Sequence, residues 1–384
     1  MKRIFLTGGT GVLGSYVLKD LLLRSNAIIY CLVRTSDKAD GRARLFESLQ
    51  VYDGASQIAD LFDKRVHVLI GEVNKPGLGL DFSQTQLLYY EIDLVIHVAA
   101  NTNLFARYTS LYGSNVLGTK NVVDFTLKTK KKSICYVSSF SVMGDSLLNP
   151  VSKFSENEFD IGQKFTKSMS YQRSKFEAEK IVRASTDLGL KWIIVRPGQI
   201  FGDSETGQYP DGLAVQPSSL FYDIFKTIIE TRLAFHSDWY FDITPVDYVS
   251  RAIVYLCMED LEFFKTFHLN NPDIKTFSEI LHILKSTGRN FEIISIQNYQ
   301  KYLVKGKLLY LDTVYRSQST RFLSNWILSS SCDFKSSGFA DCKQTVSRLT
   351  EAKIYCPVIN ARLLGLYTSK FREFSTHLIN KITD

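Results

Sequence analysis

The chain has 384 residues, of which 45% are hydrophobic and 22% are charged, with a net charge of +7 and six cysteines. This composition predicts a globular protein with one large domain and an appended subdomain, or with two domains. No dense basic run resembles a nucleic-acid-binding arm, no apolar run reaches the length of a membrane span, and no C-x-x-C pair or His cluster indicates a metal site.

The cysteines and the N-terminus predict a cellular location. Cys31 and Cys135 lie in apolar strand-like runs and are predicted to be buried thiols, which fits a reducing compartment. The first residues enter a strand pattern directly and leave no room for a signal peptide. We therefore expect a cytoplasmic protein. Its surplus positive charge indicates attraction for a phosphorylated cofactor or an acidic partner, or an ordinary solvated surface.

The first 200 residues alternate short apolar runs with helical patterns. The runs are apolar on both faces, as expected of parallel strands covered by helices, and lie at 3–7, 27–33, 65–71, 94–100, 133–139 and 192–197. Helical patterns fall between them, for example at 13–24, 115–128 and 172–188. Strands that alternate with helices predict an α/β fold with a doubly wound parallel sheet of the Rossmann type, completed by a strand at 266–271.

The rest of the chain is less regular. Residues 204–235 are rich in Gly, Pro, Ser and aromatic residues, and 272–384 are mainly helical in pattern, with a short extended piece at 291–296 and an amphipathic tail at 359–382 that predicts a packed helix. We expect a dinucleotide-binding domain formed by 1–203 plus 236–271 and a mostly helical substrate-binding subdomain formed by 204–235 plus 272–384.

A glycine motif follows the first predicted strand. The segment "RIFLTGGTGVLG" places Gly8, Gly11 and Gly14 between this strand and a helix, the context that a dinucleotide site requires. Gly8 allows the tight turn, Gly11 lets the backbone approach a pyrophosphate at the helix N-terminus, and Gly14 permits close packing of helix and strand.

The end of the second strand bears on the choice between NAD and NADP. Arg34 stands where an NAD enzyme usually presents an acidic residue, and a guanidinium can bind a 2′-phosphate through two parallel hydrogen bonds. Arg44 is either a second phosphate ligand or a solvated surface residue. Asp37 is the one nearby feature that favours NAD. The sequence therefore predicts NADPH.

Two of the 20 tyrosines are followed by a lysine four residues later, Tyr171/Lys175 and Tyr222/Lys226. Tyr171 and Lys175 open a predicted helix after the strand that ends at Ser139, and Pro197–Gly198 ends the next strand at the same edge of the sheet. Tyr222/Lys226 follows no predicted strand and has no serine in register. We therefore predict that the first pair is catalytic and that the second is accidental.

Reduction of a carbonyl explains why these residue types are needed. Hydride transfer leaves negative charge on the carbonyl oxygen, to which the Tyr171 phenol can donate its proton. Lys175 is expected to lower the tyrosine pKa, and Ser139 to donate a second hydrogen bond to the developing oxyanion. Ser138 is expected to face the packing side, and Glu177, Glu179 and Lys180 to be solvated charges.

Two further polar residues are candidates for supporting roles. His97, at the end of the fourth strand, is expected to pack near the cofactor and not to act as a base. Asn115, at the start of a predicted helix, either supports the water network of the site or is a helix-start residue without a catalytic role.

The motifs T-G-x-x-G-x-x-G, the strand-end serine, Y-x-x-x-K and R-P-G resemble the extended short-chain dehydrogenase/reductase superfamily. Further segments resemble its thioester reductase family, namely "CLVR", "RARLFESL", "GEV", "HVAANTNLFARY", "NVLGT", "RPGQIFGDSETG" and "ITPVDYVSRAIVYL". This family comprises terminal reductases of nonribosomal peptide and polyketide synthases and carboxylic acid reductases, with fatty acyl-CoA reductases as relatives. The similarity extends from residue 1 to about 300 and returns in "YCPVINARLLGLYTSKF" (355–371).

The resemblance implies a reaction. Family members use NADPH to reduce an acyl thioester on the phosphopantetheine arm of a carrier protein; a hemithioacetal forms and collapses to an aldehyde, which some members reduce further to the alcohol. The implied catalytic residues are Ser139, Tyr171 and Lys175. The implied cofactor contacts are Thr7, Gly8, Thr10, Gly11, Val12, Leu13, Gly14, Arg34, Arg44, Glu72, Val73, Ala99, Ala100, Asn101, Asn115, Tyr171, Lys175, Pro197, Gly198 and Ile200.

The chain departs from the family pattern at three positions without losing a proton donor. Ser139 stands for the usual Thr, Glu72 for Asp and Phe176 for Trp. The adenylation and carrier domains that normally precede such a module are absent from this sequence, so we expect a stand-alone reductase or an excised domain.

Two alternative interpretations remain open. One is an NADP-dependent ketone or aldehyde reductase, or a sugar-nucleotide epimerase, because these enzymes share the triad and the cofactor site. The other is a catalytically silent protein that binds NADPH for regulation. The "GDSETG" and "PVDYV" segments favour the thioester reductase. The sequence does not identify the acyl group or the oligomeric state. It also does not show whether the acyl group is carried by a carrier protein or by coenzyme A.

Overall fold

The computed structural model describes residues 1–50, 55–148, 152–209, 220–259, 261–304, 338–369 and 371. Within these residues a seven-stranded sheet has the order β12-β7-β5-β4-β1-β2-β3, and every pair of neighbours in it is parallel. Its strands are β1 (Arg3–Thr7), β2 (Ile28–Val33), β3 (Val66–Ile70), β4 (Leu94–His97), β5 (Ser133–Val137), β7 (Lys191–Pro197) and β12 (Lys265–Leu269). The predicted doubly wound α/β fold is confirmed.

The predicted strands start within one residue of the observed ones and are too long at some ends. β4 stops at His97 although the apolar run continues to Ala100, and β5 stops at Val137 although the run extends to Ser139. These extra residues form the loops at the carboxyl edge of the sheet. Apolar character therefore continues past the last ladder residue into the loops that line this edge.

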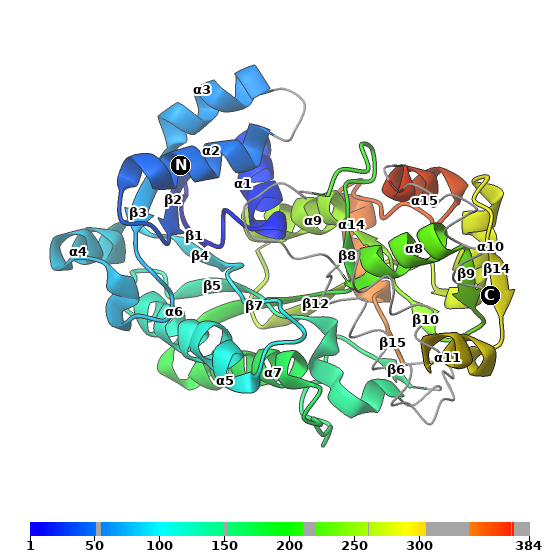
Figure 1. Cartoon of the computed structure of the whole chain (residues 1–384). Helices are drawn as coiled ribbons and strands as arrows, with labels where there is room; N and C mark the ends of the chain where they lie inside the picture. The colour runs from blue at the N-terminus through cyan, green and yellow to red at the C-terminus, as the bar shows by residue number, and fades with distance from the viewer. Residues whose placement is uncertain are drawn as a thin grey trace.

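Helices cover both faces of the sheet (Figure 1). One face carries α1 (Val12–Arg24), α2 (Lys38–Gln50), α3 (Ala55–Arg65) and α9 (Val246–Met258), and the other carries α4 (Phe82–Glu91), α5 (Tyr108–Leu111), α6 (Gly118–Thr126) and α7 (Ser170–Ala184). A π-helical turn at Tyr112–Leu117 joins α5 to α6, and short 3-10 turns lie at Pro76–Gly79, Phe140–Leu148 and Ser185–Leu188.

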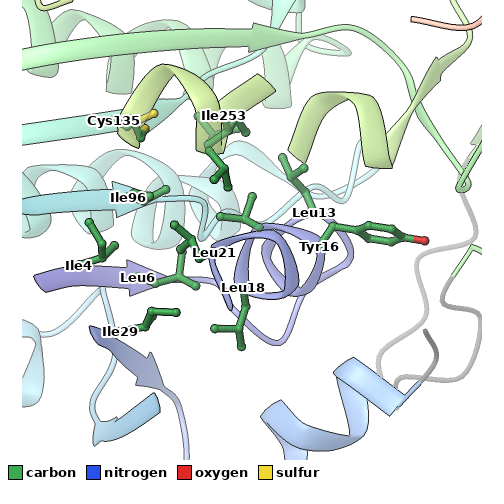
Figure 2. Packing of buried hydrophobic residues seen from close by; sticks show 14 of the residues in the cluster. Ile4, Leu6, Leu13, Tyr16, Leu18, Leu21, Ile29, Ile96, Cys135 and Ile253 are labelled. Atoms are coloured by element: carbon green, nitrogen blue, oxygen red, sulfur yellow. The ribbon is translucent and has the colours of Figure 1, made fainter. Parts of the chain in front are cut away.

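The alternation of side chains along β1 divides the core between these two faces. Ile4 and Leu6 pack with α1 and α9 in one cluster, whereas Phe5 packs with α6 in the other. Figure 2 shows Leu6 gathered with Leu21 of α1 and Ile253 of α9 in the first cluster. Cys31 and Cys135 are fully buried free thiols, as predicted.

A third apolar core lies in the second half of the chain. It is built from α8 (Leu220–Thr231), α10 (Phe277–Ser286), α11 (Ile296–Val304) and α15 (Ala361–Thr368), which gather on the side of the sheet toward which the strands run (Figure 1). Helix α14 (Lys343–Glu351) contacts the edge strand β12. The proposed division into domains stays a prediction.

Short strands form two-stranded pairs outside the seven-stranded sheet. They are β6 (Lys153–Phe154), β8 (Ile200–Phe201), β9 (Leu233–Phe235), β10 (Tyr240–Phe241), β11 (Thr244–Pro245), β13 (Lys275–Thr276), β14 (Glu292–Ile294) and β15 (Phe339–Ala340). β14 lies within the extended piece predicted at 291–296. Helix α15 is a packed helix in the predicted tail, whereas residues 370 and 372–382 of that tail lie outside the described residues. The described helices include none with the length and apolar character needed to cross a membrane.

Candidate active site

The glycine loop after β1 has the shape of a dinucleotide-binding turn. Gly8 has a φ of +81°, and a Cβ there would lie 2.6 Å from the Ala99 nitrogen. A Cβ on Gly14 would lie 1.9 Å from the Gly8 oxygen, so helix α1 can approach this closely only with glycine at both positions. No described side chain caps the N-terminus of α1 at Gly11. The N–H groups of its first turn are therefore available to an anion, and the loop fits a pyrophosphate.

The two arginines predicted to hold a 2′-phosphate lie together at the carboxyl end of β2. The Arg44 guanidinium donates to the Arg34 carbonyl oxygen at 2.7 Å, and Arg34 Nη1 lies 3.6 Å from Glu72 Oε1. The Arg34 side chain is 75% exposed, so it can reorient toward a ligand. Asp37 accepts from the Ala39 nitrogen at the start of α2 and is thus engaged by backbone.

Four of the predicted cofactor contacts have side chains that pack in the apolar cores. Val12, Leu13 and Ile200 pack in the core on the α1 side of the sheet, and Val73 packs against the other core. The Val73 carbonyl oxygen also accepts from Asn121 Nδ2 at 2.8 Å. Because these side chains pack in the cores, only their backbone atoms or part of each side chain can contact a cofactor.

Ser139, Tyr171 and Lys175 meet where β5 ends and α7 begins. The side chains of Ser139 and Tyr171 are hydrogen-bonded to each other, and Ser139 Oγ also lies 2.8 Å from Ser141 Oγ. Lys175 is buried, donates to the Val137 carbonyl oxygen at 2.7 Å and lies over the Tyr136 ring at 4.5 Å. The structure thus brings together the three residues that the sequence selected.

The electrostatics of this triad differ from the expectation that Lys175 lowers the tyrosine pKa. Burial raises the pKa of Tyr171 to about 12, although the hydrogen bond from Ser139 opposes the rise. Burial lowers the pKa of Lys175 to about 7, opposed by the charge of Glu179. Desolvation therefore outweighs the attraction of neighbouring charges here. A tyrosine with a raised pKa keeps its proton at neutral pH, which suits a proton donor.

The prediction that Glu179 is solvated is wrong, because its side chain is 0% exposed. Its Oε1 accepts from Arg196 Nη2 at 2.7 Å and from Arg183 Nη2 at 2.8 Å, and its Oε2 accepts from Ser138 Oγ at 2.6 Å. Ser138 is buried as expected. Glu179 lies one turn after Lys175 and shares its inward face of α7, a spacing that could have revealed its burial.

The neighbouring charged residues on α7, Lys180 and Glu177, are more exposed than Glu179. Lys180 is exposed, as predicted. Glu177 is only partly exposed; it accepts from Arg173 Nε at 2.8 Å and from the Tyr108 hydroxyl. The expectation of a solvated charge is therefore wrong for Glu179 and incomplete for Glu177.

Asn115 lies inside the π-helical turn and not at a helix start, which corrects the second alternative considered for it. Its Oδ1 accepts from the Asn101 nitrogen at 2.7 Å, and its Nδ2 donates to Ser174 Oγ at 2.9 Å. Ser174 Oγ in turn donates to the Tyr171 carbonyl oxygen at 2.7 Å. Asn115 therefore links the loop after β4 to the first turn of α7. Single π-turns in helices are frequent at functional sites.

His97 is fully buried between two threonines. Its Nδ1 lies 2.7 Å from Thr7 Oγ1 and its Nε2 lies 3.1 Å from Thr119 Oγ1. Burial, and next the charge of Lys175, lower its pKa to about 3. The imidazole is therefore neutral near pH 7 and serves packing beneath the loop.

Tyr222, the tyrosine of the second tyrosine–lysine pair, has a structural role. Tyr222 belongs to α8, where its hydroxyl accepts from the Gly202 nitrogen at 2.8 Å and its ring packs against the third core. It lies in a different part of the fold from Ser139, so the spacing alone carries no catalytic meaning.

The chain is similar to parts of several known biosynthetic proteins. The chain is 31% identical over 298 residues to a component of the linear gramicidin synthase of Brevibacillus parabrevis, and the alignment covers 77% of this chain and 6% of that protein. It spans at most 32% of the length of the first curated relatives.

Among solved structures, the terminal R domain from the myxalamid PKS-NRPS biosynthetic pathway superposes with a TM-score of 0.82 at 29% identity, covering 96% of this chain and 90% of that one. A reductase (R) domain of a nonribosomal peptide synthetase from Mycobacterium tuberculosis superposes with a TM-score of 0.78 at 24% identity over 99% and 92% of the chains, and shows the fold alone. The resemblance to terminal reductase domains is confirmed. Because the sequence model of the NAD-binding family described as Male sterility protein (NAD_binding_4) matches residues 6–253, the chain belongs to that family.

Proposed function

We propose that this chain reduces an acyl thioester to an aldehyde with NADPH as the hydride donor. The observation that carries the proposal is the meeting of Ser139, Tyr171 and buried Lys175 at the edge of the sheet that also holds the glycine loop. Similarity to the terminal R domain of the myxalamid pathway supports this reaction over ketone reduction or epimerisation.

Each catalytic side chain has a distinct task in this reaction. The bound cofactor supplies a hydride to the thioester carbonyl carbon. The Tyr171 phenol donates its proton to the carbonyl oxygen, and Ser139 donates a hydrogen bond to the same oxygen while its charge develops. The resulting hemithioacetal breaks its carbon–sulfur bond, releasing the thiol and leaving the aldehyde. Protonated Lys175 stabilises the phenolate left on Tyr171 until a proton returns to it.

Preference for NADPH rests on Arg34 and Arg44. Their guanidinium groups lie at the end of β2, where the 2′ position of the adenosine ribose is held in Rossmann folds. A 2′-phosphate would draw Arg34 away from Glu72, since a doubly charged phosphate is the stronger partner for a guanidinium.

The thioester is proposed to arrive on the phosphopantetheine arm of a carrier protein. The names of the relatives, which include peptide synthetases, support a carrier over free coenzyme A. The five cysteines in the described part of the chain are free thiols, which supports a reducing compartment such as the cytoplasm.

NADPH absorbance at 340 nm in the presence of carrier-bound and coenzyme A thioesters tests the proposal. We expect oxidation that depends on the thioester, with trapping of an aldehyde. Measurable NADPH binding without oxidation by any thioester or aldehyde would support the catalytically silent alternative instead.

A further inference from the structure

Asp242 gathers three segments beside the proposed active site. Its Oδ2 accepts from the Gln199 nitrogen at 3.1 Å and from Asn270 Nδ2 at 2.8 Å. Its Oδ1 accepts from Thr244 Oγ1 at 2.6 Å and from the Asn271 nitrogen at 3.2 Å. All four partners are donors and stabilise the ionised carboxylate, although burial raises the pKa of Asp242, and the carboxylate holds the ends of β7 and β12 together.

This arrangement leaves two amide oxygens without a partner. Asn270 donates through Nδ2 to Asp242, which fixes the orientation of its amide and turns Oδ1 away from the carboxylate. Within the described part of the chain, Asn270 Oδ1 and Gln199 Oε1 are buried and have no hydrogen-bond partner. Asn270 is only 5% exposed, whereas Gln199 keeps part of its surface accessible. A buried acceptor without a donor costs about 1–3 kcal/mol, so a donor is expected to reach it during function.

The two oxygens lie at the edge where catalysis is proposed. A Cβ on Gly198 would lie 1.5 Å from Asp242 Oδ2 and 2.5 Å from Asn270 Nδ2, so both side chains pack directly on the Gly198 backbone. β5, β7 and β12 are successive neighbours in the sheet, and Ser139 and Asn270 follow the outer two of them. Neighbouring strands lie about 4.8 Å apart, which places these two strand ends about 10 Å from each other.

We propose that Gln199 and Asn270 form an amide-binding subsite in which their side-chain oxygens accept hydrogen bonds from the N–H groups of a bound ligand. The inference rests on the proposed function for the identity of that ligand. The adjacent Asp242 carboxylate repels phosphate or carboxylate groups, so the subsite disfavours anionic ligands.

Two sources carry such a donor close to the reacting carbon. One is the carboxamide of the nicotinamide ring. The other is the pantetheine arm, whose two amide nitrogens lie within roughly 10 Å of the thioester carbon when the arm is extended. The reach of the pantetheine arm matches the separation of about 10 Å between the strand ends that carry Ser139 and Asn270.

Two substitutions test the subsite. Gln199→Met keeps the length of the side chain and the backbone N–H that binds Asp242, and removes the side-chain amide with its acceptor oxygen. Asn270→Ala removes the second acceptor together with one donor to Asp242. Gln86→Met, on the exposed surface of α4, is the matched control for the first change.

Dissociation constants are measured for NADPH by fluorescence titration, and for an S-acyl pantetheine by calorimetry. KM is measured for that pantetheine thioester and for the methyl thioester of the same acyl group, which lacks the arm. If the arm occupies the subsite, both variants weaken S-acyl pantetheine binding on the order of tenfold and leave NADPH and the methyl thioester unchanged. If the carboxamide occupies it, both weaken NADPH binding by a similar factor instead.

Binding of NADPH and of the pantetheine thioester at control strength in both variants would overturn the subsite. An equal rise in KM for the pantetheine and methyl thioesters, with unchanged NADPH binding, would overturn the subsite as well. The methyl thioester lacks the arm, so an equal effect on both substrates would indicate a general distortion of the site. These results are separable from failure of the proposed function, which is judged by whether the unmodified protein reduces any thioester.

Discussion

Replacing Glu179 by glutamine removes the negative charge that holds α7 to the sheet. Glu179 is fully buried and shares its carboxylate with Arg196, which is also 0% exposed, and with Arg183, which is partly exposed. In Glu179→Gln, the Arg196 guanidinium keeps the Glu158 carbonyl oxygen and His268 Nε2 as neighbours but loses its counter-charge. Leaving one partner of a buried pair uncompensated costs about 3–5 kcal/mol.

Amide hydrogen exchange within α7 measures this loss where it occurs. Because about 1.4 kcal/mol corresponds to a tenfold change, we expect exchange in α7 to accelerate by roughly a hundred- to several-thousand-fold. Glu177→Gln is the matched control, two residues earlier on the same helix. Its partly exposed contacts to Arg173 and Tyr108 predict a loss below about 1 kcal/mol. Similar exchange rates in the two variants would refute the assignment of Glu179 as the buried anchor.

The same substitution is expected to change the pH dependence of turnover. Burial lowers the Lys175 pKa to about 7 and the Glu179 charge opposes this, so removing that charge lowers the pKa further. Since the protonated lysine is the active form in the proposed reaction, activity falls as the pH rises through the Lys175 pKa. We expect the alkaline limb of the kcat profile to move to lower pH in Glu179→Gln. A limb that stays in place or moves to higher pH would contradict this role of the carboxylate.

Three other substitutions test the site. Tyr171→Phe should lower kcat by about 10²- to 10⁴-fold while NADPH binding, measured by fluorescence, is retained; turnover near the normal rate would exclude Tyr171 as the proton donor. Arg34→Ala should raise the KM for NADPH about tenfold with little change for NADH, and equal effects on both would overturn the NADP assignment. Gly14→Ala forces a Cβ to within 1.9 Å of the Gly8 oxygen and should abolish NADPH binding; a titration that matches the unmodified protein would show that the loop is not the cofactor site.

The sequence predicted the parts of the fold that depend on local patterns. Parallel strands buried on both faces appear as continuous apolar runs, and the glycine motif after β1 requires one backbone shape, so both could be located without a structure. Ser139, Tyr171 and Lys175 could be found because consecutive crossovers of a parallel sheet return to the same edge.

The features that could not be predicted depend on contacts between distant segments. The spacing of four residues from Lys175 places Glu179 on the inward face of α7, but nothing in the sequence identifies Arg196 on β7 as its partner. The π-helical turn around Asn115 has no sequence signature of its own. Asp242, Gln199 and Asn270 come from three loops, and nothing in their spacing predicts that one carboxylate joins them.

The direction of the Tyr171 pKa shift could not be predicted from the sequence either. A spacing of four residues shows that Lys175 shares a helix face with the tyrosine, but it does not show how deeply both are buried. Because desolvation depends on that depth, the direction of the shift required the structure.

Stoichiometry of the reaction tests the central proposal most directly. The unmodified protein is mixed with NADPH and a carrier-bound acyl thioester, and the loss of absorbance at 340 nm is compared with the amount of carrier thiol released. Thioester reduction predicts at least one NADPH oxidised for each thiol, with no release of thiol when NADPH is omitted. Thiol release that does not require NADPH, or binding of NADPH with neither oxidation nor thiol release, would contradict it.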